Sequence, residues 1–225
     1  MRFVTFEQAA EYIRGKTVTI VGSAPSVLDN RHGFVDSHEV VVRVNNHKTG
    51  PAAGLRTDVH YSFYGTSIRK TAAELQAEGV QLCLCKCPYG KPIQSAWHEA
   101  NRKLEGIDFS YIYSLRRSWW FCDTYIPSAA AFLQKMRLLG NHVPTTGFAA
   151  VLDVLEMGPA SVYLTGFDFF SSGLHNINER WRPGDPNDPI GHRPELEATW
   201  MLNNAHRLTF DARLATLIDV RRAAA

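Results

Sequence analysis

Two short apolar runs near the N-terminus, each followed at once by small or amide residues, constrain the fold of this chain more than any other feature. The run at 18–21 leads into a turn of small residues at 22–26, and the run at 40–44 leads into Asn45. Such runs predict strands that are buried on both faces of a parallel sheet. Small and amide residues at the carboxyl ends of parallel strands are typical of a nucleotide crevice, because a phosphate or ribose can there reach backbone N–H groups.

Helical patterns alternate with apolar runs, which predicts an α/β fold with a single Rossmann-like, mostly parallel sheet and helices on both faces. We expect strands at 17–21, 39–44, 59–63, 81–87, 109–114 and 161–165, and helices at 6–15, 67–78, 95–104, 128–139, 147–156 and 194–208. The last of these helices is expected to close the chain. With 225 residues, 45% of them hydrophobic, the sequence predicts one domain over residues 1–225.

Charge and hydropathy exclude several classes of protein. The net charge is only +2 and no basic run stands out, which argues against a nucleic-acid partner. No apolar stretch approaches the roughly 20 residues that span a bilayer. The N-terminal residues lack the apolar segment of a signal peptide. We therefore expect the protein to work in a cytoplasm.

Three cysteines, Cys83, Cys85 and Cys87, occupy alternate positions, so that on a strand all three thiols would face one side. They could form a three-thiolate metal site or serve as small buried hydrophobes of a central strand. We favour the second interpretation, because free cysteine is among the most buried residue types. The chain also lacks an Asp-x-Asp pair near a strand end to hold Mg²⁺. We expect neither a metal nor a cofactor.

Three blocks of the sequence resemble, in order, the long, short and very short motifs of the sialyltransferases. They lie at residues 22–59, 144–169 and 190–197. The first contains Arg43-Val44-Asn45, and the last carries His192 and Glu197 in an H-x-x-x-x-E spacing. The Ile-Gly-His step before that spacing is similar to the one in the bacterial enzymes. Neither of the first two blocks contains a cysteine, so the disulfide that joins them in the animal-type enzymes is absent, which suits a reducing compartment.

The resemblance implies a variant of the GT-A-like glycosyltransferase fold. It implies a metal-independent, inverting transfer of sialic acid, or a related sugar acid, from a CMP-linked donor to a glycan hydroxyl. The expected partners are therefore a CMP-sugar donor and a glycan acceptor.

The residues that match the donor site lie first of all in the opening block. Gly22, Ser23 and Ser26 match the small-residue loop that approaches the nucleotide, and Asn45 matches an asparagine that contacts it. From the residues alone, an ordinary strand-to-helix turn and a solvated loop asparagine are the alternatives.

The second block supplies the other predicted donor contacts. Thr145, Thr146 and Gly147 open a predicted helix, where unpaired N–H groups favour an anion or a base carbonyl. Either threonine could be the N-cap, and the capping and binding roles are compatible. Gly166 permits close approach of a ligand, and Asp168 is suited to bind ribose hydroxyls or to cap the next turn.

His192 is the predicted general base, because an unperturbed imidazole titrates at about 6.5 and can accept a proton at cytoplasmic pH. Glu197 is suited to orient the imidazole or simply to lie in a charged first turn. His175, with Arg180 and Arg182, is a candidate to offset the charge of the departing phosphate.

The sequence departs from the bacterial pattern at several phosphate contacts. Phe170 stands where the first of two tyrosines would be, and Gly65 replaces an asparagine. Val143 and Pro144, not an arginine, stand immediately before Thr145. Missing donors of this kind can each be worth a few kcal/mol. An alternative therefore stays open: a nucleotide-binding protein on the same scaffold with different or lost chemistry, for example pyrophosphokinase-like.

Two further segments carry predictions. Residues 171–191, rich in Gly, Pro, Asn and Asp, are predicted to form a flexible lid. Trp119 and Trp120, next to two arginines, are candidates for an acceptor-sugar platform, a partner surface or a peripheral contact with the inner membrane. We favour core packing of at least one of them. An oligomer is compatible with the sequence.

Overall fold

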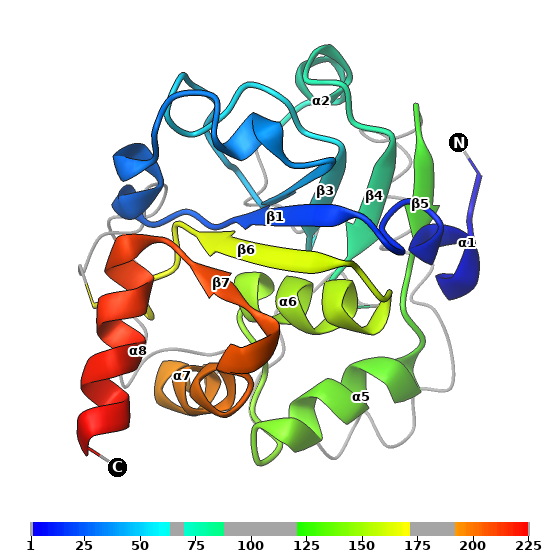
Figure 1. Ribbon diagram of the computed structural model, residues 1–225. Coiled ribbons are helices and arrows are strands. Elements are labelled where there is room, and N and C mark those ends of the chain that lie inside the picture. The colour runs from blue at the N-terminus through cyan, green and yellow to red at the C-terminus, as the bar shows by residue number, and fades with distance from the viewer. Residues whose placement is uncertain (1, 64–69, 88–120, 172–191, 225) are drawn as a thin grey trace.

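The computed structural model describes residues 2–63, 70–87, 121–171 and 192–224, and the structural statements below concern these residues. A seven-stranded sheet in the order β5-β4-β3-β2-β1-β6-β7 forms its centre, and each neighbouring pair of strands is parallel (Figure 1). The strands are β1 Thr17–Val21, β2 Val40–Val44, β3 Val59–Ser62, β4 Leu82–Cys85, β5 Asp123–Tyr125, β6 Ser161–Thr165 and β7 Thr209–Phe210.

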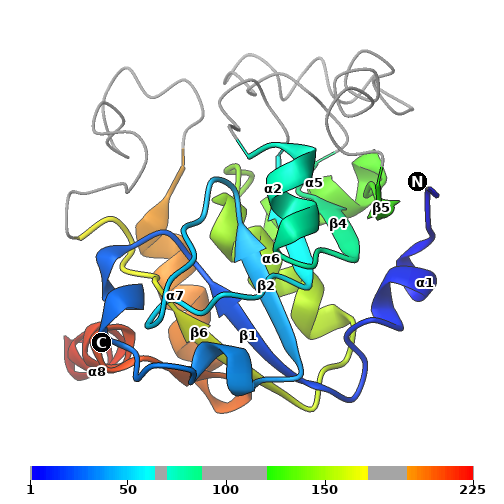
Figure 2. The same cartoon turned by 90° about the horizontal axis from the view of Figure 1, so that it is seen from above.

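Helices cover both faces of this sheet (Figures 1 and 2). They are α1 Phe6–Ala10, α2 Ala72–Ala77, α5 Ala129–Leu138, α6 Thr146–Glu156, α7 Pro194–Asn203 and α8 Ala212–Ala224, with 3-10 turns η1 Pro25–Asp29, η2 Val35–Ser37 and η3 Ala205–Arg207. The expected α/β class, the parallel sheet and the helices on both faces are confirmed. None of the helices in the described ranges is both long enough and apolar enough to cross a bilayer.

The alternation of side chains along the strands divides the core in two. Val40, Val42 and Val44 pack on the face that carries α6, together with Phe148 and Val151 of that helix. The intervening residues of the strands face the opposite side, where a smaller group consists of Val21, Val27, Val35, Val41 and Ala53. Burial of every residue of β2 explains why its sequence is an unbroken run rather than an alternating one.

Hydroxyl caps fix the starts of four helices. Thr5 and Thr71 each form a capping box, with Gln8 and Glu74 as the reciprocal partners. Ser128 caps α5 and Thr145 caps α6, the latter by accepting a hydrogen bond from the N–H of Phe148. The expectation that one of the two threonines at 145–146 is a cap is therefore confirmed for Thr145.

The predicted strands at 17–21 and 161–165 are confirmed to the residue. The predictions near the two chain ends need correction. The first helix ends at Ala10, not at Gly15, and the helix from Pro194 ends at Asn203 instead of closing the chain. The chain continues through η3, β7 and α8, which the sequence prediction missed together with β5. The predicted elements at 95–104 and 109–114 lie outside the described residues.

The cysteines belong to the core, but they do not share one side of a strand. Cys83 and Cys85 pack with Cys122, whereas Cys87 packs against Phe132 and its neighbours. The expectation that all three alternating thiols face one way is wrong, because β4 ends at Cys85 and the alternation ends with it. The four cysteines are buried and form no disulfide, and the Cys83 and Cys122 sulfurs lie 3.3 Å apart.

Candidate nucleotide site at the carboxyl edge of the sheet

The strand order places a topological switch point between β1 and β6. From β1 the chain builds the sheet in one direction through β2, β3, β4 and β5, and it then returns to place β6 on the other side of β1. In open parallel sheets, ligands bind in the crevice outside the carboxyl ends of the strands at such a point. Gly22 follows β1 and Gly166 follows β6, so two of the predicted site residues lie at this switch point.

Gly22 and Gly166 bring the two loops into direct contact. The N–H of Gly22 donates to the carbonyl of Thr165 at 2.8 Å, and the N–H of Ala24 donates to the carbonyl of Gly166 at 2.9 Å. A Cβ at position 22 would lie 2.2 Å from the Gly166 carbonyl oxygen, and Gly166 itself has a φ of +73°. Both positions therefore require glycine for the contact between the loops, whether or not a ligand also approaches them.

Asp211 secures this contact from the end of β7. Its Oδ2 accepts hydrogen bonds from Thr165 Oγ1 at 2.9 Å and from the N–H of Gly166 at 3.0 Å, while Oδ1 accepts from the N–H of Leu214 at 2.7 Å. The same carboxylate thus caps α8 and holds the loop after β6. The sequence prediction missed Asp211, although an Asp just before a helix is the signal of an N-cap.

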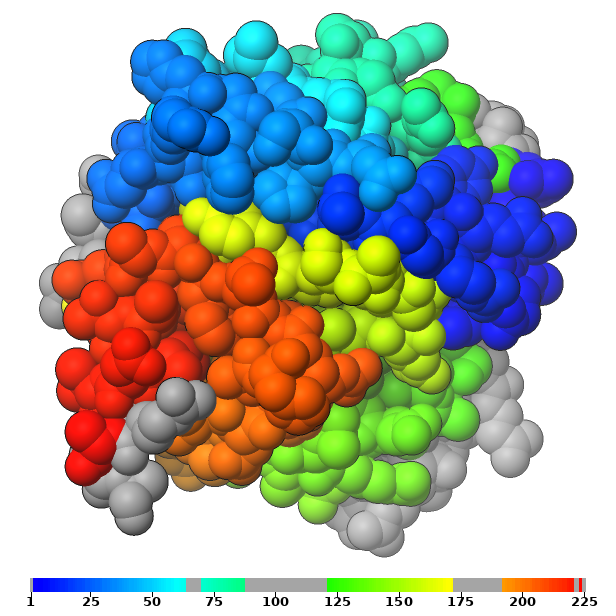
Figure 3. All heavy atoms as spheres, in the orientation of Figure 1, coloured from blue at the N-terminus to red at the C-terminus, as the bar shows by residue number. Residues whose placement is uncertain are grey.

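Ser26 lies on the side of its loop that faces Asp211. Its hydroxyl donates to Asp211 Oδ2 at 3.3 Å, and Ser26 lines a cavity of about 320 Å³ together with Asn30, Tyr163 and Arg213. The segment 25–37 and α8, which flank this cavity, lie side by side in the space-filling view (Figure 3). Ser23 is half-buried in the same loop as Gly22.

Asn45 ends β2 in a left-handed conformation with φ +50°. Its N–H donates to the carbonyl of Tyr61 at 3.0 Å, and its Oδ1 accepts from the hydroxyl of Ser62 at 3.0 Å. Left-handed backbone in a residue other than glycine is uncommon, and it concentrates at turns and functional sites. Asn45 is therefore held firmly at the sheet edge where the sequence places a nucleotide contact.

The N-terminus of α6 is held by α7. Glu197, 3% exposed, accepts hydrogen bonds from Thr145 at both its N–H, 2.6 Å, and its Oγ1, 2.7 Å. Because the first N–H groups of a helix have no acceptor within it, those of Thr146 and Gly147 retain their capacity to bind an anion. A Cβ at Gly147 would lie only 2.7 Å from Cε1 of Phe167. The absence of a side chain at position 147 therefore allows Phe167, in the loop after β6, to pack against the start of α6.

His192 is attached to the same turn. Its Nδ1 lies 2.6 Å from the carbonyl oxygen of Val143, and the residue is 8% exposed. A carbonyl can only accept, so Nδ1 carries the proton and the lone pair of the neutral ring is on Nε2. Through Val143 and Thr145, His192 and Glu197 both fix the segment that leads into α6.

Asp168 caps the turn that follows β6. Its Oδ1 accepts from the N–H of Phe170 at 2.9 Å, and its carbonyl accepts from the N–H of Ser171 at 2.9 Å. Phe169 and Phe170 both have left-handed backbones, with φ of 51° and 61°. Two such residues in succession are held by this turn, which forms part of the same edge as Gly166.

Two buried ionisable groups near this edge, Glu197 and Lys86, influence each other electrostatically. Burial raises the pKa of Glu197 to about 7, against the opposing effects of the Thr145 hydrogen bonds and the charge of Lys86. Burial likewise lowers the pKa of Lys86, the residue that follows β4. The charge of Glu197 acts in the opposite direction and raises that pKa. Lys86 was missed as a site residue, because it stands within the apolar cysteine run.

The structure thus brings most of the predicted residues to one edge of the sheet, with Ser26 directed toward Asp211. His175, Trp119, Trp120 and the segment 172–191 lie outside the described residues.

No family model matches this sequence, and no curated protein matches it either. Solved structures do match over most of the chain. The sialyltransferase CstII from Campylobacter jejuni in complex with CMP-3FNeuAc has a TM-score of 0.54 and 16% identity over 88% of each chain. The same enzyme with cytidine-5′-monophosphate has a TM-score of 0.55 and 16% identity, over 89% of this chain and 87% of that one. A mammalian sialyltransferase has a TM-score of 0.52 and 18% identity, over 88% of this chain and 69% of that one.

The fold and the edge described above define a Rossmann-like α/β protein with its candidate site at the switch point of a parallel sheet. Within that class, the chain has the sialyltransferase-like, GT-A-like fold of these bacterial and mammalian structures.

Proposed function

We propose that the protein is an inverting, metal-independent glycosyltransferase that moves sialic acid, or a related sugar acid, from a CMP-linked donor to a glycan hydroxyl. The observation that carries the proposal is the attachment of His192 to the turn that leads into the N-terminus of α6. This arrangement holds a proton acceptor against the turn that leads into an anion-binding helix end. The structures of the same fold that were solved with CMP and with CMP-3FNeuAc support a CMP-linked donor.

The donor nucleotide would lie across the switch point. The loop with Gly22 and Ser23 and the loop with Gly166 and Asp168 would approach its ribose and phosphate. Asn45 and the first N–H groups of α6 would supply hydrogen-bond donors. Ser26 supports this site through Asp211, since its hydroxyl is already directed to that carboxylate.

His192 would act as the general base. The acceptor hydroxyl oxygen attacks the anomeric carbon of the donor, the bond from that carbon to the phosphate oxygen breaks, and the hydroxyl proton passes to Nε2 of His192. The hydrogen bond from Nδ1 to the Val143 carbonyl fixes the tautomer that this step requires. Glu197 would contribute by holding Thr145 at the start of α6, and His175 by offsetting the charge on the leaving CMP.

We propose that residues 1–225 form one catalytic domain and that residues 171–191 are its lid. The solved complex of CstII with a trisaccharide acceptor and CMP supports a glycan as the second substrate. Trp119 and Trp120 are candidates for contact with that glycan or with the inner membrane.

One observation favours a second candidate function, a nucleotide-binding protein of the same fold with different or lost chemistry. Phe170, which replaces a phosphate-binding tyrosine of the bacterial pattern, is held by the Asp168 turn in a left-handed conformation. A phenyl ring donates no hydrogen bond to a phosphate.

Calorimetric titration separates the two functions in stages. CMP, CDP, UDP, GDP and ATP are each titrated with EDTA and then with Mg²⁺. We expect CMP and CDP to bind equally well in both conditions. Tight binding of UDP or ATP only with Mg²⁺, without binding of CMP, would contradict the proposal. Release of CMP from CMP-sialic acid, followed with and without a lactose-terminated acceptor, then separates a transferase from a binding protein.

A further inference from the structure

Asn45, the residue that follows β2, is held by the neighbouring strand β3. Both of its acceptors, the backbone carbonyl oxygen and Oδ1, are bonded to residues of that strand. His60 Nε2 lies 2.8 Å from the carbonyl oxygen of Asn45, and the Ser62 hydroxyl lies 3.0 Å from Asn45 Oδ1. The N–H of Asn45 is itself bonded to the carbonyl of Tyr61. Three consecutive residues of β3 therefore fix the conformation of Asn45.

These contacts determine what Asn45 can offer to a ligand. Its carbonyl and its Oδ1 are both engaged as acceptors by β3. The remaining polar group is the Nδ2 amide, which makes no hydrogen bond to any residue in the described ranges and belongs to a half-buried side chain. Because Nδ2 can only donate, Asn45 is set to recognise an acceptor, such as a phosphate oxygen or the carbonyl of a pyrimidine base.

The donors on β3 are themselves fixed and uncharged. His60 and Ser62 are both completely buried. Burial lowers the pKa of His60 to about 3, so the ring is neutral at physiological pH and its Nε2 proton is committed to the Asn45 carbonyl. Strand alternation directs His60 and Ser62 to the same face of the sheet, the face opposite α6.

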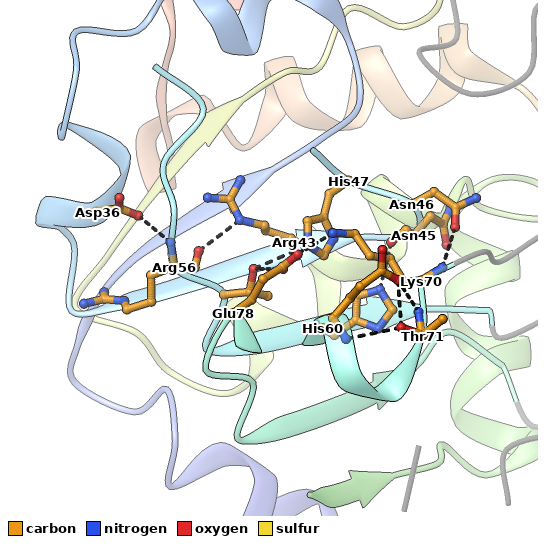
Figure 4. A network of polar contacts seen from close by, with 12 residues as sticks. Asp36, Arg43, Asn45, Asn46, His47, Arg56, His60, Lys70, Thr71 and Glu78 are labelled. Atoms are coloured by element: carbon orange, nitrogen blue, oxygen red, sulfur yellow. Dashed lines mark hydrogen bonds and ion pairs between the residues drawn. The ribbon is translucent and has the colours of Figure 1, made fainter. Parts of the chain in front are cut away.

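A network of polar contacts leads from His60 back to Asn46, the neighbour of Asn45 (Figure 4). The ring of His60 packs edge-on against His47, with centroids 5.5 Å apart. His47 Nε2 is bonded to Glu78 at 2.5 Å, and Glu78 also pairs with the ammonium group of Lys70. The N–H of Lys70 reaches Asn46 Oδ1 at 3.4 Å, which closes the network on the residue next to Asn45.

We propose that His60 and Ser62 are positioning residues that hold Asn45 in its left-handed conformation with its amide N–H group directed at the nucleotide. This inference rests on the proposed function for the identity of the ligand, CMP. It adds two buried residues of β3 that match none of the sequence blocks on which the donor site was predicted.

The test combines CMP affinity with a ligand-free report on Asn45. CMP is titrated into wild type, Ser62→Ala, His60→Leu and His60→Gln, and the side-chain amide resonances of Asn45 are recorded for each by NMR without ligand. Thr19→Val is the matched control, since Thr19 is completely buried in β1 and its hydroxyl has no partner within the described part of the chain.

We expect Ser62→Ala and His60→Leu each to weaken CMP binding by roughly tenfold, the effect of one lost hydrogen bond. Their Asn45 amide resonances should move toward the positions of an unstructured chain. His60→Gln, which keeps an N–H donor, should restore affinity to within about threefold of wild type. In an Asn45→Gly background, where the amide is gone, Ser62→Ala should cause no further loss of affinity.

Unchanged amide resonances and unchanged affinity in both Ser62→Ala and His60→Leu would overturn the inference, as would equal losses in the Thr19→Val control. A failure of the proposed function looks different. In that case CMP would not bind wild type and would not shift the Asn45 resonances, while the two β3 variants would still displace them. That result would uphold the positioning role and reject CMP as the ligand.

Discussion

Glu197 in the first turn of α7 accepts two hydrogen bonds from Thr145, the residue that caps α6, at 2.6 Å from the N–H and 2.7 Å from Oγ1. The contact joins residues that are 52 positions apart. It fixes the start of α6, where an anion would bind, relative to the helix that follows His192. One buried carboxyl group therefore links the anion-binding start of α6 to the segment that carries His192.

The burial of Glu197 in this contact predicts that the stability of the folded protein depends on pH. The pKa of Glu197 is raised by burial to about 7 in the folded protein, from 4.5 without these surroundings. The folded state therefore retains a proton between these values that the unfolded state has lost. The stability that the protonated Glu197 contributes is complete below pH 4.5, and it is lost as the pH rises from there to about 7.

We expect Glu197→Gln, which stays neutral and keeps the shape, to gain about 1–3 kcal/mol of unfolding free energy relative to wild type between pH 5 and pH 8. Urea denaturation of both proteins at several pH values measures this. The difference between the two curves matters, because burial also lowers the pKa of His60 and so destabilises the folded state toward acid in both proteins alike. A difference that is constant with pH would contradict the prediction.

The contact between Gly22 and Gly166 predicts a local intolerance to any side chain. In Gly22→Ala the added Cβ would lie 2.2 Å from a backbone oxygen, which cannot rotate away as a side chain could. We expect a loss of about 1–3 kcal/mol of stability, as for overpacking in a core, and a loss of nucleotide binding. Gly50→Ala is the matched control, because its Cβ would meet nothing within 4 Å. Thermal unfolding of the two variants compares them, and equal melting temperatures would refute the proposed contact.

The carboxyl edge of the sheet was largely predictable from the sequence, because its signals are local. An apolar run that ends in a small or amide residue marks a strand end, and Gly22, Asn45 and Gly166 each follow a strand of the observed sheet. β5 and β7, with three and two residues, are too short for a pattern to reveal. The Asp211 contacts reach Ser26 across 185 positions, and no local pattern encodes a contact of that range. His60 and Ser62 lie inside a strand, where polar residues carry no motif.

A direct test of the donor site uses two substitutions of Asn45. Asn45→Ala and Asn45→Gly both remove the amide, and each should weaken CMP binding by about 1–2 kcal/mol, with EDTA as well as with Mg²⁺. Both variants lose the hydrogen bond from Ser62, but only alanine is also strained by the φ of +50°, so Asn45→Ala should lower the melting temperature more than Asn45→Gly. Calorimetry and thermal unfolding of the same samples separate the two effects. Unchanged CMP affinity in both variants would remove Asn45 from the site.

The assignment of His192 as general base predicts a loss of rate without a loss of donor binding. His192→Ala should bind CMP nearly as well as wild type but lower transfer from CMP-sialic acid by roughly 10²–10⁴-fold. His192→Asn should be equally slow, because an amide keeps polarity but cannot accept the proton. In wild type the rate should fall on acidification, since protonation removes the lone pair of Nε2.

The neighbouring His142, which precedes the carbonyl that holds His192, supplies the control for these rates. His142→Ala removes an imidazole next to the same turn and should leave transfer within about threefold of wild type, the size of an ordinary surface effect. The melting temperature of each variant is measured beside its rate. If His192→Ala is poorly folded, the rate of a folded His192→Asn decides the assignment instead. Near-normal turnover in folded His192→Ala would rule out this residue as the base and would favour the alternative chemistry on the same fold.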